Sequence, residues 1–270
     1  MKIAFQGVRG AYSEMAINSY FKEEKQVIGL PISEDVCEAL IKGKVDVAAL
    51  PIENSIVGNV NVNLELIYKH NFSIIGEHFQ EINHNLLVCK NTKLAQVKKV
   101  YSHPIALDQC RDFLKKNNIE AIPTYDTAGA CLKVKNSNNI EIGAIASKLC
   151  EEYYDLDLIE KNIQTNSNNL TRFIFFTTKE NKPSNISMEK TTLAFKTAHK
   201  PGALLDCLQV FACFKINLTR LISKTVPEDT FSYVFFIDFE GGKNEERIQL
   251  ALKALKLHTK EIKILGSYPL

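Results

Sequence analysis

Short apolar runs alternate with helical patterns along the first part of the chain. Strands are predicted at Lys2–Phe5, Val45–Leu50, Lys99–Tyr101 and Ile142–Ala146, and a helix follows the first of them near Tyr12–Phe21. Strands that alternate with helices are typical of α/β architecture, in which helices cover the faces of a sheet. The first part of the chain is therefore predicted to be an α/β domain.

Individual residues set the expected limits of these elements. Ser33 is expected to cap the helix that it begins, and Asp126 is expected to cap another. Pro51 is expected to break the strand before it, because proline has no backbone N–H. A helix is predicted from about Ile105 to Lys116, with Pro104 in its first turn.

The chain is expected to cross twice between two such α/β units, near Gly76–Gln80 and near Ile163–Asn168. A double crossing resembles the hinge of bilobed small-molecule-binding folds, in which the site lies between the lobes. Asn168–Phe173 is interpreted as the segment that follows a helical stretch, returns to the first lobe and faces the cleft. The expected lobes are about 1–78 with 166–178, and 79–165.

The pattern changes after a polar linker at Lys179–Glu189. The order that follows is β-α-β-β-α-β, which is the ferredoxin-like motif and is common in regulatory or dimerising modules. The predicted elements are strand Thr191–Lys196, helix Pro201–Phe214, strands Ile216–Thr225 and Thr230–Glu240 around Pro227–Asp229, helix Glu245–Leu257 and strand Lys260–Leu265. Two domains are predicted, 1–178 and 190–270.

Composition argues against several classes of protein. The net charge of +2 and the short lysine clusters do not favour a nucleic-acid-binding surface. No apolar run approaches the roughly 18 residues of a membrane helix, and no secretory signal is visible. The seven cysteines are scattered without a Cys-x-x-Cys pair, which favours a reducing cytoplasm. No helical His-x-x-x-His is present, so we expect no metal.

Polar side chains follow several predicted strands. Asn54 and Ser55 lie in a loop after the strand Val45–Leu50, and Ser102 ends the strand Lys99–Tyr101. Ligands of open α/β sheets bind at such strand ends. Two further candidates are Gln109, one turn into the next helix, and Thr127, at a later helix start. These side chains suit carboxylate or hydroxyl oxygens, although a solvated turn remains an alternative for the loop.

Thr171 and Arg172 enter an apolar strand beside the amides of Asn168 and Asn169. A hydroxyl next to a guanidinium suits a small anion. An ordinary strand start with a solvated arginine is the alternative. Successive side chains of a strand point in opposite directions, so both residues cannot face one ligand. We expect Thr171 to point inward and Arg172 to brace the loop.

Several segments form an ordered set along the chain: Gly7–Glu14, Pro51–Ser55, Ser102–Pro104 with Gln109–Cys110, Asp126–Ala128, Asn169–Phe173, Ala198–Leu204 and Leu265–Pro269. Taken together, they resemble the prephenate dehydratase family, and the last two resemble its ACT domain. The resemblance covers essentially the whole chain. The resemblance implies a bilobed, periplasmic-binding-protein-like catalytic domain, a C-terminal ACT domain and a cofactor-free lyase that converts prephenate to phenylpyruvate. It also implies that Thr171 is catalytic and that Asn54 and Gln109 lie in the cleft; Ser55, Ser102, Thr127 and Arg172 are further candidates for substrate binding.

The chain departs from the family pattern at the ACT site for phenylalanine. The family's Glu-Ser-Arg-Pro is replaced by Ile222-Ser223-Lys224-Thr225, so the acid, the planar guanidinium and the proline are lost. The remaining candidates of this degraded site are His199, Gly202, Ala203, Leu204 and Ser223. We expect weakened or absent binding of L-phenylalanine. Ile105 also stands where many relatives carry glutamine.

Two other readings stay open. Arogenate dehydratases share these motifs, and a non-catalytic sensor with an ACT domain would need the cleft but not Thr171. The family also implies a homodimer or homotetramer, since exposed strands of such a module need partners or protection.

Overall fold

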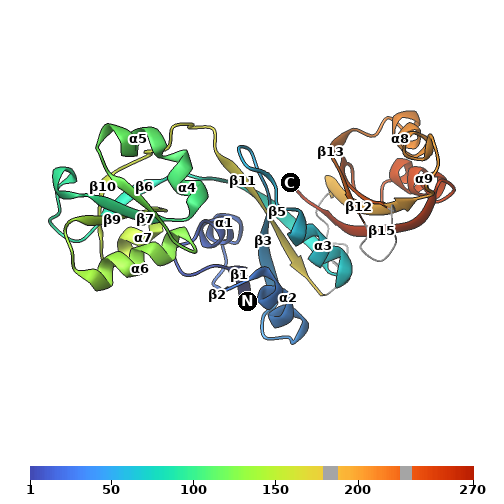
Figure 1. The fold of residues 1–270 in the computed structure, drawn as a ribbon. Coiled ribbons are helices and arrows are strands. Elements are labelled where there is room, and N and C mark those ends of the chain that lie inside the picture. The colour runs from blue at the N-terminus through green and yellow to red at the C-terminus, as the bar shows by residue number, and fades with distance from the viewer. Residues whose placement is uncertain (179–187, 226–232) are drawn as a thin grey trace. The chain divides into compact units, whose positions relative to one another are not determined.

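The computed structural model describes residues 1–178, 188–225 and 233–270, and the chain forms two compact units. Strands β5 (Ser73–Glu81) and β11 (Leu170–Thr177) each run from one unit into the other (Figure 1). The first unit comprises Met1–Asn63 and His78–Ile174, and the second comprises Leu64–Glu77 and Phe175–Leu270.

The first lobe of the first unit is built on strands in the order β2-β1-β3-β11. β1 (Lys2–Gln6) lies between β2 (Gln26–Leu30) and β3 (Val47–Asn54) and pairs with both in parallel. Both β1 and β3 are buried and apolar, as expected of parallel strands covered on two faces. Helices α1 (Tyr12–Tyr20) and α2 (Ser33–Ile41) both pack against β1 and β3.

Two expectations for this lobe were wrong. β3 continues through Pro51 to Asn54, since its pairing with β1 already ends at Ala49 and proline is tolerated where the ladder is open. Ser33 does not cap α2. The N-cap is Ile32, and the Ser33 hydroxyl instead donates to Gln6 Oε1 at 2.9 Å, which ties the helix to β1.

β3 ends in a hairpin with the short strand β4 (Gly58–Asn59), and α3 (Asn61–Lys69) follows. The stretch after Pro51 was expected to be a loop, and α3 was not predicted. Asn63 donates to the Pro51 carbonyl at 2.6 Å and fastens the start of α3 to the strand. The hairpin therefore has a fixed position at the carboxyl end of β3.

The second lobe is built on a five-stranded sheet with helices on both faces (Figure 1). Leu86 and Val88 pack with α4 and α5 on one face, while Leu87 packs with α6 and α7 on the other, as the alternation of a strand requires. The strand order is β10 (Asp157–Glu160), β6 (Asn85–Val88), β9 (Ile142–Ala146), β7 (Lys99–Ser102) and β8 (Glu120–Pro123), and the helices are α4 (Pro104–Gln109), α5 (Arg111–Lys116), α6 (Thr127–Ser137) and α7 (Leu149–Tyr153).

The predicted helix Ile105–Lys116 is split at Cys110 into α4 and α5. The backbone carbonyl of Gln109 accepts from the backbone N–H of Thr165 at 2.8 Å, so the series of hydrogen bonds within the helix is interrupted there. Asp126 accepts from the N–H of Gly129, which confirms its expected role as the cap of α6. Pro104 occupies the first turn of α4, as predicted.

The return crossing was expected to follow a helical stretch, but residues 161–169 form neither helix nor strand. Their backbone N–H and carbonyl groups bond to other segments instead of to the next turn. Ile163 donates to the His84 carbonyl at 2.9 Å, and the Asn169 carbonyl accepts from Ile82 at 2.8 Å. The two crossings are thereby bonded to each other.

The second unit confirms the β-α-β-β-α-β order, with strands in the order β13-β14-β12-β15-β5. Its core lies between helices α8 and α9 and the strands, and includes Leu193, Phe211 and Phe239. The predicted turn at Pro227–Asp229 and most of the predicted linker lie outside the described residues. The elements are β12 (Lys190–Thr197), α8 (Ala203–Cys213), β13 (Leu218–Thr225), β14 (Tyr233–Glu240), α9 (Glu246–Leu255) and β15 (Thr259–Tyr268).

A buried ion pair joins β5 to β12 within this unit. Lys190 Nζ donates to Glu77 Oε1 at 2.8 Å, and the Tyr268 hydroxyl donates to the other carboxylate oxygen at 3.1 Å. All three side chains are buried. Loss of one partner would leave a buried charge uncompensated.

We predict that Lys190→Met lowers the free energy of unfolding by about 3 kcal/mol, because the buried Glu77 carboxylate loses the ammonium group that lies 2.8 Å away. Lys99→Met is the matched control. Its exposed strand lysine pairs with Glu120 at 3.0 Å, and exposed pairs contribute less than about 1 kcal/mol. Urea denaturation measures both. Equal losses of unfolding free energy in the two variants would contradict the view that the buried Lys190–Glu77 pair matters more for stability than an exposed pair.

Candidate active site

The Asn54 side chain organises the hairpin after β3. Its Oδ1 accepts from the backbone N–H groups of Ile56 at 3.0 Å and Val57 at 2.9 Å. A backbone N–H can only donate, so these two bonds decide which end of the amide is oxygen. The Asn54 NH2 group must therefore point the opposite way, toward the start of β11.

Three acceptors on the returning segment meet this NH2 group. Asn54 Nδ2 lies 2.8 Å from Asn169 Oδ1, 2.9 Å from Thr171 Oγ1 and 3.2 Å from the Leu170 carbonyl. Thr171 is buried, with 8% of its surface exposed. Its oxygen accepts from Asn54, and among the described residues its hydroxyl hydrogen has no acceptor. The Thr171 hydroxyl therefore retains one hydrogen that the network does not use.

The network continues into the second lobe through Gln109. Asn169 Nδ2 donates to Gln109 Oε1 at 3.1 Å, and His84 Nε2 lies 2.7 Å from the same oxygen. His84 Nδ1 lies 3.0 Å from the Tyr12 hydroxyl, which also donates to the Asn83 carbonyl at 2.8 Å. Side chains from both lobes and from both crossings are therefore connected by hydrogen bonds.

Burial perturbs two titratable groups of this network. Desolvation lowers the pKa of His84, and the hydrogen bond to Gln109 opposes that shift only in part. Desolvation raises the pKa of Tyr12 well above its ordinary value. Both groups are therefore neutral near pH 7.

A cavity of about 400 Å³ lies beside the network in the first unit. The first lobe contributes Gln6, Tyr12, Ser13 and Pro51, and the second contributes His103, Asp126 and Thr127. Tyr12 belongs to both the cavity wall and the network. The cavity adjoins the first turns of α1 and α6, where backbone N–H groups favour an anion. The side-chain cap of α6 is Asp126, whereas the N-cap of α1 makes no such bond.

The structure brings the predicted residues Asn54, Gln109 and Thr171 into one network, and Thr127 lines the cavity. Ser55 and Ser102 hold backbone instead. The Ser55 hydroxyl donates to the Asn168 carbonyl and accepts from Leu170 N–H, each at 3.0 Å. Ser102 is fully buried and donates to the Ile145 carbonyl at 2.6 Å.

Arg172 points away from Thr171, as the alternation of the strand requires. It is buried, with 3% of its surface exposed, and NH1 lies 3.8 Å from Glu53 Oε2. Its guanidinium also lies 6.0 Å from the centre of the Phe79 ring. The contact with Glu53 links β11 to β3, and the contact with Phe79 links β11 to β5.

Three members of the network were not among the predicted site residues. Asn169 lies within the segment that the sequence analysis emphasised, and Tyr12 lies in the Gly7–Glu14 segment. Both residues therefore lie in segments that carry the family resemblance. His84 follows strand β5 as an isolated histidine, and no local pattern marks it.

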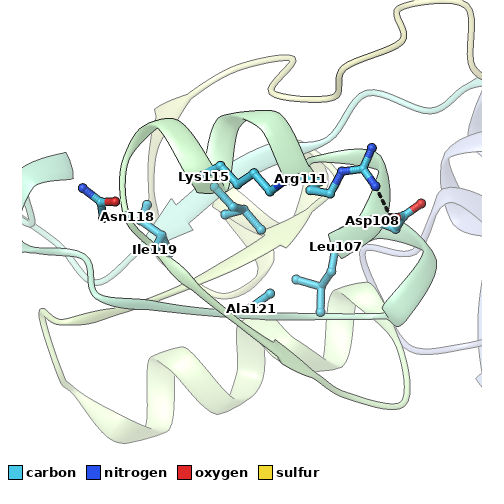
Figure 2. Close-up of a pocket in the computed structure, with 8 residues that line it drawn as sticks. Leu107, Asp108, Arg111, Lys115, Asn118, Ile119 and Ala121 are labelled. Carbon is cyan, nitrogen blue, oxygen red and sulfur yellow. Dashed lines mark ion pairs between the residues drawn. The ribbon is translucent and has the colours of Figure 1, made fainter.

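A separate hollow of about 430 Å³ lies on the second lobe (Figure 2). Leu107 and Ala121 form its base, and Arg111 pairs with Asp108 across its rim at 3.7 Å. Its lining includes none of the predicted site residues, so the candidate site is the network and the cavity beside it.

The second unit has a cavity of about 150 Å³ at the start of α8. His199, Ala203 and Leu204 line it together with Tyr233 and Phe235. Gly202 precedes α8 with φ of +81°, a conformation that favours glycine. Ser223 is exposed and pairs with Phe235 across β13 and β14. The candidate regulatory residues thus surround or adjoin this cavity.

Residues 1–178, 188–225 and 233–270 lack two kinds of structural feature. No cluster of three or more histidine, cysteine, aspartate or glutamate side chains suited to a metal ion occurs in those ranges. The helices described there also include none with the length and hydropathy of a membrane span.

Comparison with known proteins gives a consistent result. Residues 3–181 match the family model for prephenate dehydratase. The chain is 35% identical to the prephenate dehydratase of Methanocaldococcus jannaschii, covering 97% of this chain and 95% of that protein. It is 34% identical to arogenate dehydratase/prephenate dehydratase 2 of Arabidopsis thaliana, covering 100% of this chain and 73% of that protein.

Two solved structures share the fold over the whole chain. One is the prephenate dehydratase of Arthrobacter aurescens in complex with L-Phe, with a TM-score of 0.91, 26% identity and 90% of that chain covered. The other is GqqA, described as a quorum quenching acylase, with a TM-score of 0.93, 30% identity and 98% of that chain covered. The α/β fold with a separate small domain, predicted from the sequence, is confirmed.

The lowered pKa of His84 predicts a pH dependence of stability. As the pH falls through about 6.5, the unfolded chain takes up a proton that the native His84 does not, so the folded state loses stability. We expect the unfolding free energy of the wild type to fall more between pH 7.5 and 5.5 than that of His84→Phe. The difference is at most about 1.4 kcal/mol per pH unit. Equal slopes in denaturant titrations would contradict this prediction.

Proposed function

Because the chain belongs to the prephenate dehydratase family, we propose that it catalyses the decarboxylating dehydration of prephenate to phenylpyruvate. The observation that carries this proposal is the arrangement at Thr171. Its oxygen accepts from Asn54 Nδ2 at 2.9 Å, and its hydroxyl hydrogen remains for a ligand. The protein is accordingly a carbon–oxygen lyase that belongs to phenylalanine biosynthesis.

The chemistry requires a donor at the leaving oxygen. The bond between the ring and its carboxylate breaks, CO2 departs, and the electron pair enters the ring. The C–O bond on the opposite ring carbon then breaks, and the hydroxyl leaves with its own pair as hydroxide, which a proton converts to water. Aromatisation drives the reaction, so the protein must hold the dianion and stabilise the departing oxygen. These steps need no cofactor.

Thr171 is proposed as the catalytic donor to that oxygen. An ordinary threonine hydroxyl is too weak an acid to give up its proton freely near pH 7. A hydrogen bond that strengthens as charge develops on the departing oxygen does not require full proton transfer. The Asn54 NH2 group, which donates to Thr171 Oγ1, polarises the hydroxyl in the same direction.

Substrate binding is proposed for the cavity beside the network. Neutral amides and the N-terminus of α1 would receive the carboxylates, with Thr127 on the cavity wall and Gln109 in the adjacent network as side-chain contacts. Asn54 is proposed to orient Thr171, because its own donors and acceptor are already engaged. Ser55, Ser102 and Arg172 are proposed to support the site. The two serine hydroxyls bond to backbone groups, and Arg172 pairs with Glu53.

Arogenate is the alternative substrate, since the similar Arabidopsis protein is named for both compounds. The two differ by an ammonium in place of a ketone. A non-catalytic sensor is the other alternative, and it would have no use for a hydroxyl donor at Thr171. Turnover of either compound distinguishes an enzyme from a sensor.

The predicted domains 1–178 and 190–270 are proposed as the catalytic and ACT regulatory domains. A cytoplasmic location is proposed because all seven cysteines are free thiols, six of them buried, which suits a reducing compartment. We also propose a homodimer or homotetramer, and L-phenylalanine as a weakened effector.

We predict that the purified protein converts prephenate to phenylpyruvate, and that Thr171→Ala lowers kcat about 100-fold to 1000-fold. Removal of one hydrogen-bond donor to a developing oxyanion typically lowers kcat by about that factor. Thr171→Ser retains the donor and should keep most of the activity. Absorbance of phenylpyruvate follows the reaction, and parallel assays with arogenate follow phenylalanine.

Thr191→Ala is the matched control. Thr191 is also a buried strand threonine, and its hydroxyl donates to the Gly241 carbonyl at 2.8 Å in the second unit. Its kcat should stay within about twofold of the wild type. The proposal fails if Thr171→Ala turns over prephenate at the wild-type rate, or if neither substrate is consumed.

We predict that calorimetry detects no tight binding of L-phenylalanine to the wild type. Lys224 lacks the planar guanidinium with which an arginine donates two parallel hydrogen bonds to a carboxylate, and its Nζ already pairs with Glu65 Oε1 at 2.6 Å. Restoring the family motif with Ile222→Glu, Lys224→Arg and Thr225→Pro should restore binding. Tight binding by the wild type would contradict the prediction.

A further inference from the structure

We propose that His84 is a positioning residue, which fixes the Gln109 amide so that its NH2 group is the end available to substrate. The proposal goes beyond the assigned site residues and, for its kinetic consequences, rests on the proposed function. It is carried by the direction of the hydrogen bonds that connect the hairpin after β3 to the second lobe.

That direction follows from the backbone N–H groups of Ile56 and Val57, which identify Asn54 Oδ1. Asn54 Nδ2 must then donate to Asn169 Oδ1, so Asn169 Nδ2 faces Gln109. The Gln109 atom that receives this bond is consequently Oε1. Each of these hydrogen bonds therefore permits only one of the two possible orientations of the next side-chain amide.

His84 Nε2 lies 2.7 Å from the same oxygen of Gln109. An oxygen offers no proton, so Nε2 must carry the hydrogen and Nδ1 must have the lone pair. The Tyr12 hydroxyl, 3.0 Å from Nδ1, is then the donor on that side and shares its hydrogen with the Asn83 carbonyl. The structure assigns the Nε2–H tautomer to His84.

Two donors thus hold Gln109 Oε1, whereas Gln109 Nε2 has no hydrogen-bond partner among the described residues. A free amide side chain rotates readily, and reversal would present an oxygen to an anionic substrate. The bonds from His84 and Asn169 prevent that reversal. The amide then presents two N–H donors, which suit a carboxylate or hydroxyl oxygen.

The surroundings of His84 are built to hold the ring in one place. It is 2% exposed, its backbone N–H donates to Gln164 Oε1 at 2.9 Å, and its carbonyl accepts from Ile163 N–H at 2.9 Å. The Tyr12 ring packs edge-on at 5.7 Å. His84 is therefore pinned to the opposite crossing, and its imidazole links the cavity wall at Tyr12 to Gln109.

The kinetic test compares two substitutions at this position. His84→Phe keeps the ring but loses the donor, and we expect kcat/KM for prephenate to fall about tenfold, the value of one hydrogen bond of about 1.4 kcal/mol. His84→Gln places an amide donor near the former Nε2 and should recover activity to within about threefold. His78→Phe is the control, since this half-buried histidine of β5 lies outside the network. Unchanged kcat/KM in His84→Phe would overturn the proposal.

A double-mutant cycle decides whether His84 acts through Gln109. In a Gln109→Leu background no amide remains to be oriented, so His84→Phe should cause almost no further loss. If the two losses multiply, His84 acts on something other than Gln109 and the proposal is wrong. Urea denaturation of each variant separates loss of folded protein from loss of rate.

A spectroscopic test is independent of activity. Long-range ¹H–¹⁵N spectra report which imidazole nitrogen carries the proton, and we expect His84 in the wild type to be the Nε2–H tautomer. An Nδ1–H tautomer would overturn the assignment even in an active enzyme. If the wild type turns over neither prephenate nor arogenate, the proposed function fails, while the tautomer still decides the orientation of Gln109.

Discussion

Two hydrogen bonds from the backbone of the hairpin after β3 determine which side-chain groups of the site donate hydrogen bonds and which accept them. The N–H groups of Ile56 and Val57 fix the Asn54 amide, and that amide donates to Thr171, so the Thr171 oxygen accepts and its hydrogen stays outside the network. The same order of donors and acceptors continues through Asn169 to Gln109. One turn of backbone thus orients groups from both lobes, without any charged residue in the chain of bonds.

The folding of the two crossings makes this arrangement possible. β11 enters the first lobe at Leu170, and the irregular segment before it bonds to the other crossing through Ile163 and Asn169. Arg172, on the opposite side of the strand, is neutralised by Glu53. The buried apolar residues that follow, Phe173 to Phe176, anchor the strand, so Thr171 is held at the edge of a rigid core.

Periodicity predicted most strands and helices, because burial imposes a repeat of two or 3.6 residues that the sequence displays. Competing bonds decided what periodicity missed. Pro51 stays within β3 because the pairing of β3 with β1 has already ended at Ala49. The helix breaks at Cys110 because the backbone carbonyl of Gln109 accepts a hydrogen bond from Thr165. Motif resemblance marked Asn54 and Thr171, whereas His84 contacts Gln109 across 25 positions and left no local signal.

In the proposed dehydration, the two donors left over by the network would act on the substrate without a cofactor. Thr171 offers one hydrogen and Gln109 offers its NH2 group, and both are neutral. A neutral donor binds a hydroxyl group weakly in the ground state and more strongly as that oxygen gains charge, so its contribution favours the transition state. A buried cation at the same position would also bind the carboxylates of the substrate tightly, and part of the binding energy would not lower the barrier. In the proposed reaction, the orientation that Asn54 fixes would therefore favour turnover over retention of the ligand.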